Sequence, residues 1–263
     1  AAITKVEKTT GLARQQVEAM ADQLQYMSSE ITPTATNELL RYAEVAGQLG
    51  TKSAADILNL VTAADALNNS TNLAGDAAVE MLARILTMTG EGIPQIQNLS
   101  SAVVALGNDF NVTEADIVHM TKEIVTGTQE IKLGSAAAAA FATALGELGQ
   151  PAERSRTAMQ RLAGAIKQAS ISGGEDLQRL TKITGLTGEE IQKSLGTEPE
   201  KVLVAFLKGL KNINDAGGQM AGTLNRMGID GTEALGVLGT LASGVDRLEL
   251  ALAASNKNWV AGN

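Results

Sequence analysis

The sequence predicts an all-α protein, and three observations support this prediction. Apolar residues recur at spacings of three and four through most of the 263 residues. Helix-capping residues and glycines bound these runs, and the alternating β-branched pattern typical of strands is absent. Only 2% of the residues are aromatic, so Ala, Leu, Ile, Val and Met must form the core. Such a core suits helices that pack closely through small side chains.

Residues 1–31 carry a heptad pattern and are predicted to form one helix that ends before Pro33. The apolar or small positions are Ile3, Val6, Thr10, Ala13, Val17, Met20, Leu24, Met27 and Ile31. A 3.5-residue period that persists over about four heptads favours a coiled coil between copies of the chain. The expected oligomer seam consists of Ile3, Val6, Val17, Met20, Leu24, Met27 and Ile31. The alternative is an amphipathic helix that packs on its own domain.

Residues 32–173 are expected to form a helical-repeat region. Helix starts are signalled by Ser53, Asn72, Thr113 and Pro151, and helix stops by Gly50, Gly90, Gly107, Gly127 and Gly149. Starts recur about every 20 residues, so two helices make a unit of about 40, as in a helical solenoid. An irregular helical bundle explains the same signals equally well.

Residues 174–263 are predicted to form short C-terminal helices. The expected starts are Thr187 with Glu190, Thr197 with Glu200, and Asp230 with Glu233, and the expected stops are Gly185 and Gly196. Pro199 suits the first turn of a helix that begins near it. A run of small residues around Gly217 and Gly218 then separates this helix from the last part of the chain.

This alternation of starts and stops resembles the core region of the tape-measure proteins that set tail length in long-tailed phages. The positions that carry the resemblance are Gly185, Leu186, Glu189, Glu190, Phe206, Leu207, Gly209, Leu210, Leu224, Met227, Gly228 and Ile229. The likeness continues more loosely from about Thr32 to Trp259. Tape-measure proteins are typically much longer, so the resemblance also implies that this chain is a portion of a longer protein.

The resemblance implies a structural segment that lies in the tail tube or tail tip, sets tail length and takes part in DNA delivery. It implies a virion location, with contacts to the host envelope during infection. The implied partners are further copies of the chain, with a homotrimer favoured, and tail-tube, tail-tip or baseplate proteins. Contact with phage DNA and host membrane would occur in passing, without sequence-specific nucleic acid binding.

Composition argues against several kinds of chemistry. The net charge of −8 opposes wrapping of nucleic acid, which requires clustered Lys and Arg. No cysteine is present, and His119 is the only histidine, so no His or Cys metal site can be assembled. Adjacent carboxylates such as Glu189 and Glu190 suit first helical turns, where the helix dipole stabilises them. We therefore expect no catalytic residues, no metal, no cofactor and no enzymatic activity.

Two low-charge segments raise the question of membrane insertion. They span residues 133–148 and 234–245, and each is shorter than the roughly 20 residues that cross a bilayer. Burial inside a soluble protein is the expected state. The alternative function is a membrane-active helical module that inserts into the host envelope during DNA ejection.

Overall fold

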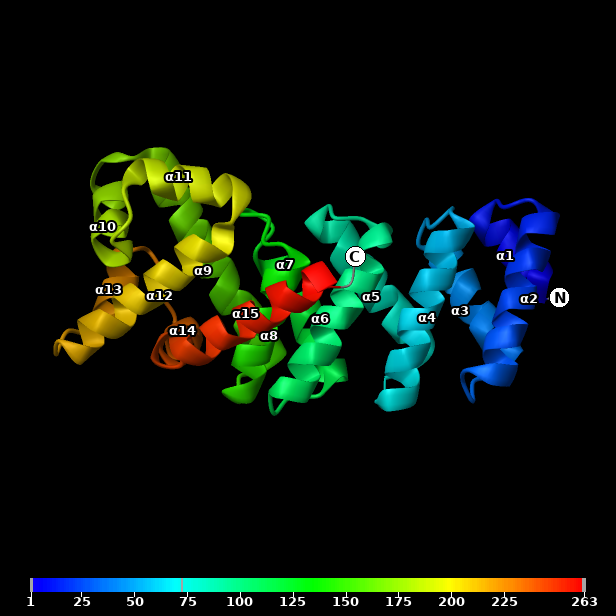
Figure 1. The fold of residues 1–263 in the computed structure, drawn as a ribbon. Coiled ribbons are helices and arrows are strands. Elements are labelled where there is room, and N and C mark those ends of the chain that lie inside the picture. The colour runs from blue at the N-terminus through cyan, green and yellow to red at the C-terminus, as the bar shows by residue number, and fades with distance from the viewer. Residues whose placement is uncertain (1, 72, 262–263) are drawn as a thin grey trace.

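The computed structural model describes residues 2–71 and 73–261, and this part of the chain is all-helical, as predicted (Figure 1). Within it lie fifteen α-helices and one short 3₁₀ helix, η1 (Ile93–Gln95), and no strand. The helices follow one another from the N-terminus at one end of an elongated molecule, and the last helix turns back along it (Figure 1). The predicted fold class is therefore confirmed.

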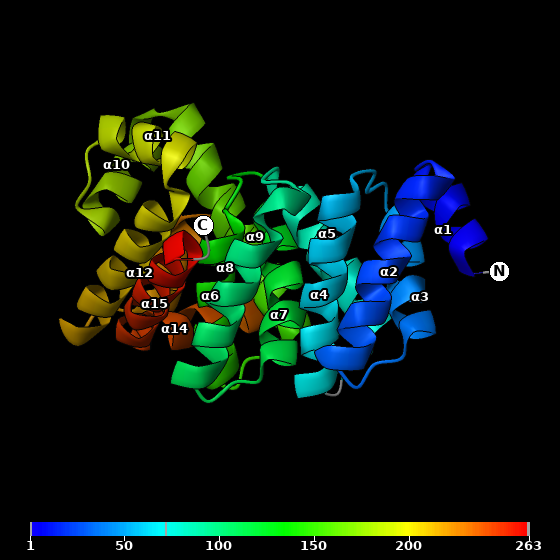
Figure 2. The same cartoon turned by 45° about the vertical axis from the view of Figure 1, so that its right-hand side comes forward.

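The first nine helices stack in two rows. They are α1 (Ala2–Thr10), α2 (Arg14–Glu30), α3 (Thr36–Gln48), α4 (Ala54–Ser70), α5 (Gly75–Thr89), α6 (Ile96–Asp109), α7 (Glu114–Gly127), α8 (Ser135–Glu147) and α9 (Ala152–Ser172). Each odd-numbered helix from α1 to α9 packs against the next odd-numbered helix, and α2, α4, α6 and α8 pack in the same way. Figure 2 shows α2, α4 and α6 side by side on one face of the molecule.

The remaining helices are short, apart from α12 and α15. They are α10 (Gly174–Thr184), α11 (Gly188–Thr197), α12 (Pro199–Asp215), α13 (Met220–Arg226), α14 (Thr232–Ser243) and α15 (Val245–Ala261). Helices α10, α11 and α14 all contact α9, and α12 crosses α10, α11 and α14. Helix α15 then returns to the first part of the chain and packs mainly on α6 and α8 (Figure 1).

Several predicted helix boundaries are confirmed. The side chains of Ser53 and Thr113 cap α4 and α7, where they accept hydrogen bonds from the backbone N–H groups of Asp56 and Asp116. Helix α9 begins directly after Pro151. Gly90 ends α5 in the left-handed conformation, with φ of 78°. Helix α3 ends just before Gly50, α8 ends just before Gly149, and α7 ends at Gly127.

Other predicted boundaries are wrong. Gly107 and Gly196 were expected to stop helices but lie inside α6 and α11, where neither has a positive φ. The N-cap positions expected at Thr197 and Asp230 are held by Glu198 and Gly231. A glycine permits the left-handed turn that ends many helices, but its presence does not require that turn. The start expected at Asn72 lies outside the described residues.

The single helix predicted over residues 1–31 is interrupted. Helix α1 ends at Thr10 and α2 begins at Arg14. Gly11 has φ of 72°, and the Thr10 hydroxyl accepts a hydrogen bond from the Leu12 N–H at 3.2 Å, which closes a local turn. The break lets α1 fold back against α3 while α2 packs against α3 and α4. One internal glycine was enough to divide the heptad pattern between two helices.

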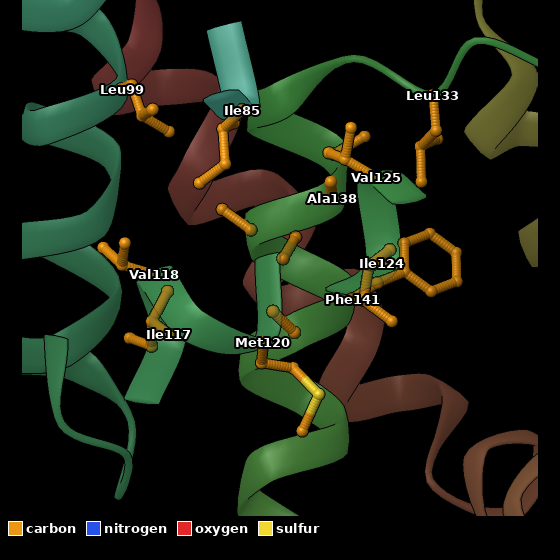
Figure 3. Close-up of a cluster of buried hydrophobic side chains, with 14 of the residues drawn as sticks. Ile85, Leu99, Ile117, Val118, Met120, Ile124, Val125, Leu133, Ala138 and Phe141 are labelled. Atoms are coloured by element: carbon orange, nitrogen blue, oxygen red, sulfur yellow. The ribbon is translucent and has the colours of Figure 1, made fainter. Parts of the chain in front are cut away.

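The core consists mainly of aliphatic side chains and alanines, as the composition predicted. Figure 3 shows part of it, where α5, α6, α7 and α8 meet: Ile85, Leu99, Ile117, Val118, Met120, Ile124, Val125, Leu133, Ala138 and Phe141. Helix α8 buries nearly its whole length, including four consecutive alanines at 137–140. Small side chains let neighbouring helices approach closely, so burial comes from dense backbone packing more than from large rings.

Candidate functional site

The positions that carry the family resemblance begin at the turn between α10 and α11. Gly185 ends α10 in the left-handed conformation with φ of 70°. Thr187 then caps α11: its hydroxyl accepts from the Glu190 N–H at 3.2 Å, and the Glu190 carboxylate accepts from the Thr187 N–H at 2.7 Å. The Thr187 hydroxyl also donates to the Glu190 carboxylate at 2.9 Å, and this bond and the bond from the Thr187 N–H lower the pKa of the Glu190 carboxyl. The predicted capping box is confirmed, and both exposed carboxylates, Glu189 and Glu190, lie in the first helical turn.

The middle of the motif lies on α12 and forms a tight helix crossing. Phe206, Leu207 and Leu210 are fully buried. Gly209 faces the end of α10, where a Cβ would lie 2.7 Å from the carbonyl carbon and 2.9 Å from Cγ2 of Ile183, with the carbonyl oxygen closer still. Only a residue without a side chain permits this approach. Leu186 completes the group, half-buried against the same core.

The last part of the motif closes α13 and connects it to α9. Gly228 has φ of 77°, and the Ile229 N–H donates to the carbonyl of Leu224 at 2.9 Å, so the chain turns sharply after the helix. Ile229 and Leu224 are buried. Just beyond, the Arg161 guanidinium on α9 donates to the carboxylate of Asp230 at 2.9 Å. The motif glycines therefore end helices or let helices cross closely, and the apolar motif positions are buried or partly buried.

The predicted oligomer seam is occupied by the chain itself. Val6, Val17, Met20, Leu24 and Met27 are all buried without any partner chain, Ile3 is partly buried, and Ile31 is 68% exposed. Their neighbours are α3 and α4, so the amphipathic helix on its own domain, the alternative to the coiled coil, describes residues 1–31 in this structure. The heptad spacing correctly predicted an apolar helix face. Such a face can be buried either by another copy of the chain or by other helices of the same chain, and here the same chain buries it.

The sequence did not predict which helices α15 packs against. This helix buries Leu248, Ala251, Leu252 and Ser255, which follow the spacing i, i+3, i+4 and i+7. The Ser255 hydroxyl donates to the carbonyl of Ala136 on α8 at 2.7 Å. The spacing of these residues was visible in the sequence, but nothing in it indicated which helices they would contact.

An ion pair fixes the beginning of α15. The Arg247 guanidinium donates two hydrogen bonds to the Glu147 carboxylate, at 2.6 and 2.7 Å, and lies 4.7 Å from the centre of the Phe110 ring. The two bonds hold the pKa of the Glu147 carboxyl below its usual value, and a bond from the Asn111 N–H acts in the same direction. Arg247 therefore joins the end of α8 to the end of α6.

Reactive groups do not converge in the described residues. His119 is exposed on α7, at the edge of a cavity of about 660 Å³ whose acidic lining residues are Glu114 and Asp116. Among the described residues no group of three or more His, Cys, Asp or Glu side chains lies close enough to hold a metal ion. The Thr113 hydroxyl beside His119 in this cavity donates to Asp116 at 2.7 Å, and it belongs to the cap of α7.

Neither low-charge segment forms a membrane span: in the part of the chain that the structure describes, no helix combines the length and apolar character that crossing a bilayer requires. Helix α8, which contains most of residues 133–148, lies buried between α7 and α15. Helix α14, which contains most of residues 234–245, packs on α9 and α12.

The fold and these contacts define the chain as an all-α protein of closely stacked helices. Comparison with family models, curated proteins and solved structures gives no match.

Proposed function

We propose that the chain is a structural segment of a phage tail tape-measure protein, located in the tail tube or tail tip. One observation carries this proposal: the three motif glycines end a helix or permit a close helix crossing, and the apolar motif positions are buried or partly buried around them. Gly185 and Gly228 have positive φ angles that turn the chain after a helix. Gly209 leaves room for Ile183 of α10, and Phe206 on the same helix as Gly209 is fully buried. Residues with these roles fix how the helices pack and so fix the shape of the segment. A structural segment that packs inside a tube needs a defined shape and no reactive group.

In this proposal the two helix rows form a solenoid-like stack that packs inside the tail. Glycine turns interrupt the stack too often for it to be an extended ruler, whose helices would advance 1.5 Å per residue. The segment would instead form a compact helical part near one end of the ruler and take part in DNA delivery. A virion location and the absence of enzymatic activity belong to the same proposal.

The proposed assembly is a homo-oligomer, with a trimer favoured by the family resemblance alone. Because Val17 and Leu24 are buried inside one chain, contacts between copies would use other surfaces. Tail-tube and tail-tip or baseplate proteins are the other proposed partners. Its acidic net charge of −8 suits a surface past which DNA moves without binding.

The test is whether the chain is a component of tails. Virus particles produced by cells that encode the chain are purified, their tails are separated from heads, and peptides of the chain are sought by mass spectrometry. The proposal expects these peptides in the tail fraction, in a constant ratio to the tube protein. Peptides confined to the cell lysate, with none in purified tails, would contradict it.

A second measurement addresses the membrane-active alternative. The purified chain is mixed at neutral pH with vesicles of phosphatidylethanolamine and phosphatidylglycerol that enclose a fluorescent dye. The structural proposal expects no dye release, because the apolar segments at 133–148 and 234–245 are packed inside the fold. Rapid release at a low ratio of protein to lipid would favour the alternative.

A further inference from the structure

A groove between α2 and α4 is lined by apolar side chains and lies open. It has a volume of about 640 Å³, and its walls are Asp22, Gln23, Leu24, Tyr26, Met27, Ile31, Ala55, Leu58, Asn59 and Thr62. Two of its side chains, Tyr26 and Ile31, are 62% and 68% exposed. Large apolar groups exposed side by side on a soluble surface often mark a binding site.

The same row of helices shows what such a groove can hold. Helix α15 lies on α6 and α8, and the groove lies on α2 and α4, which precede them in the row (Figure 2). Helix α15 docks through four residues at i, i+3, i+4 and i+7, beginning at Leu248, and adds an arginine that pairs with a carboxylate of the row. This is the recognition mode of an amphipathic helix in a groove. The way α15 packs on α6 and α8 thus shows, within the same protein, how a helix could pack in the α2–α4 groove.

The charges around the α2–α4 groove are acidic. Asp22 lines it, Glu30 follows on α2, and Asp56 lies beside the lining residue Ala55 on α4. Within the described residues, none of these three carboxylates forms an ion pair, in contrast to Glu147 in the α15 seat.

The basic residues at the beginning of α2 and just before α4 are already engaged. Arg14 pairs with Glu7 and Glu18, and the Lys52 ammonium donates to the carbonyl of Thr9. The groove therefore presents an apolar floor with one carboxylate on its wall and two more beside lining residues, none of them in an ion pair within the part of the chain that the structure describes, and its electrostatic complement is a helix with Lys or Arg beside its apolar stripe.

We infer that the α2–α4 groove binds an amphipathic helix of a partner protein, with apolar residues at i, i+3, i+4 and i+7 and basic residues on both flanks. A second copy of this chain suits the groove poorly. The chain carries net charge −8, and its lysine-bearing helix α12 already buries its apolar face through residues such as Phe206 and Leu207. The inference goes beyond the proposed tail role, because it names the chemistry of a partner and does not depend on where the protein is located.

The probe is a fluorescein-labelled synthetic helix of 18 residues, with Leu at i, i+3, i+4 and i+7 positions and Lys elsewhere. Its counterpart has Glu in place of every Lys. Fluorescence anisotropy with the full chain is expected to show saturable binding of the Lys peptide, weakened by added salt, and at least tenfold weaker binding of the Glu peptide. Equal binding of both peptides would overturn the inference.

Variants of the chain locate the binding site. The double variant Tyr26→Gln, Ile31→Gln removes the exposed apolar anchors without changing charge, and we expect about tenfold weaker binding or more. Its matched control is Leu49→Gln, Ile171→Gln, two exposed apolar residues outside the groove, which should bind like the parent. Equal effects of the two double variants would show that the peptide does not use the groove. Circular dichroism verifies that each variant is folded.

A charge pair completes the test. Asp22→Asn with Glu30→Gln should weaken binding of the Lys peptide severalfold, whereas Asp109→Asn with Asp246→Asn removes the same net charge from exposed sites elsewhere and should have a smaller effect. Equal losses would mean that only the total charge matters, which contradicts the inference. Sedimentation of the chain alone tests the other occupant: a dimer abolished by Tyr26→Gln, Ile31→Gln would assign the groove to a second copy.

Discussion

Replacement of Gly209 by alanine tests the helix crossing on which the C-terminal region depends. The added methyl group would lie 2.7 Å from the carbonyl carbon of Ile183 and 2.9 Å from its Cγ2, whereas real Cβ atoms keep at least 3.0 Å. Most of the obstruction is backbone, so no side-chain rotation relieves it. Helix α12 must move away from α10, and the buried contacts of Phe206 and Leu210 loosen with it.

The magnitude follows from two opposing effects. Overpacking of a core costs about 1–3 kcal/mol, and alanine gains up to about 1 kcal/mol over glycine in a helix interior. Gly236 on α14 isolates the second effect, because no heavy atom lies within 4 Å of a Cβ built there. Because backbone obstructs the methyl group, the cost lies toward the upper end of that range, and after the helix-propensity gain we expect Gly209→Ala to lower the free energy of unfolding by about 2 kcal/mol, and Gly236→Ala to leave it unchanged or raise it slightly.

Urea denaturation followed by far-ultraviolet circular dichroism measures both variants against the parent. For a chain of this size, 1 kcal/mol shifts the melting temperature by about 2–4 °C, so a thermal scan provides a second reading. If Gly209→Ala were as stable as Gly236→Ala, helices α10 and α12 would not cross at Gly209 as described. The role assigned to the motif glycine would then be wrong.

Three further predictions concern other parts of the chain. Leu24→Ala should lower the free energy of unfolding, measured by urea denaturation, by about 2–5 kcal/mol, because Leu24 is buried. Because it is buried within one chain, the mass measured by light scattering should equal that of the parent. A lower mass would show that Leu24 lies in a contact between copies. Glu147 has a depressed pKa when folded, so its pairing with Arg247 stabilises the fold above the usual carboxyl pKa and is lost as pH falls. Glu147→Gln should therefore be less stable than the parent at pH 7, with the difference shrinking as the pH falls below the usual carboxyl pKa; a difference that does not shrink in acid would contradict the ion pair. Burial and the bond from its hydroxyl to Glu38 raise the pKa of Tyr42 to about 12. In a Tyr26→Phe variant, phenolate absorbance should therefore rise well above pH 10 as long as the helical dichroism persists, and a midpoint near 10 in the folded protein would be inconsistent with this burial.

Local signals in the sequence predicted the helix ends well where the deciding interaction lies within a few residues. Ser53, Thr113 and Thr187 cap helices as expected, since the hydroxyl and the N–H it accepts from belong to the same turn. Glycine was a less certain signal. Gly90 and Gly185 are left-handed helix ends, but Gly196 is an ordinary position within α11, because a glycine tolerates the left-handed turn without imposing it.

The candidate site was partly predictable. The motif positions were selected by order and spacing, and the confirmed capping box at Thr187 shows that part of that pattern records local geometry. The reason for Gly209 could not be read from the sequence, because Ile183 lies on a different helix and the crossing exists only after α10 and α12 pack. The same holds for the ion pair between Glu147 and Arg247, whose partners are far apart in the chain.

The sequence by itself determined that the chain is helical, where several helices begin, and which face of some of them must be buried. Only the tertiary structure decided what covers those faces: α3 and α4 cover the apolar side of α2, α15 returns to cover α6 and α8, and the groove between α2 and α4 stays open. The physical reason is that hydrogen bonds and caps act between near neighbours in the chain, whereas apolar burial is non-directional and accepts any surface of suitable shape. An apolar stripe in the sequence therefore indicates that this face of the helix is buried. Which helix covers the face depends on how all the helices pack together.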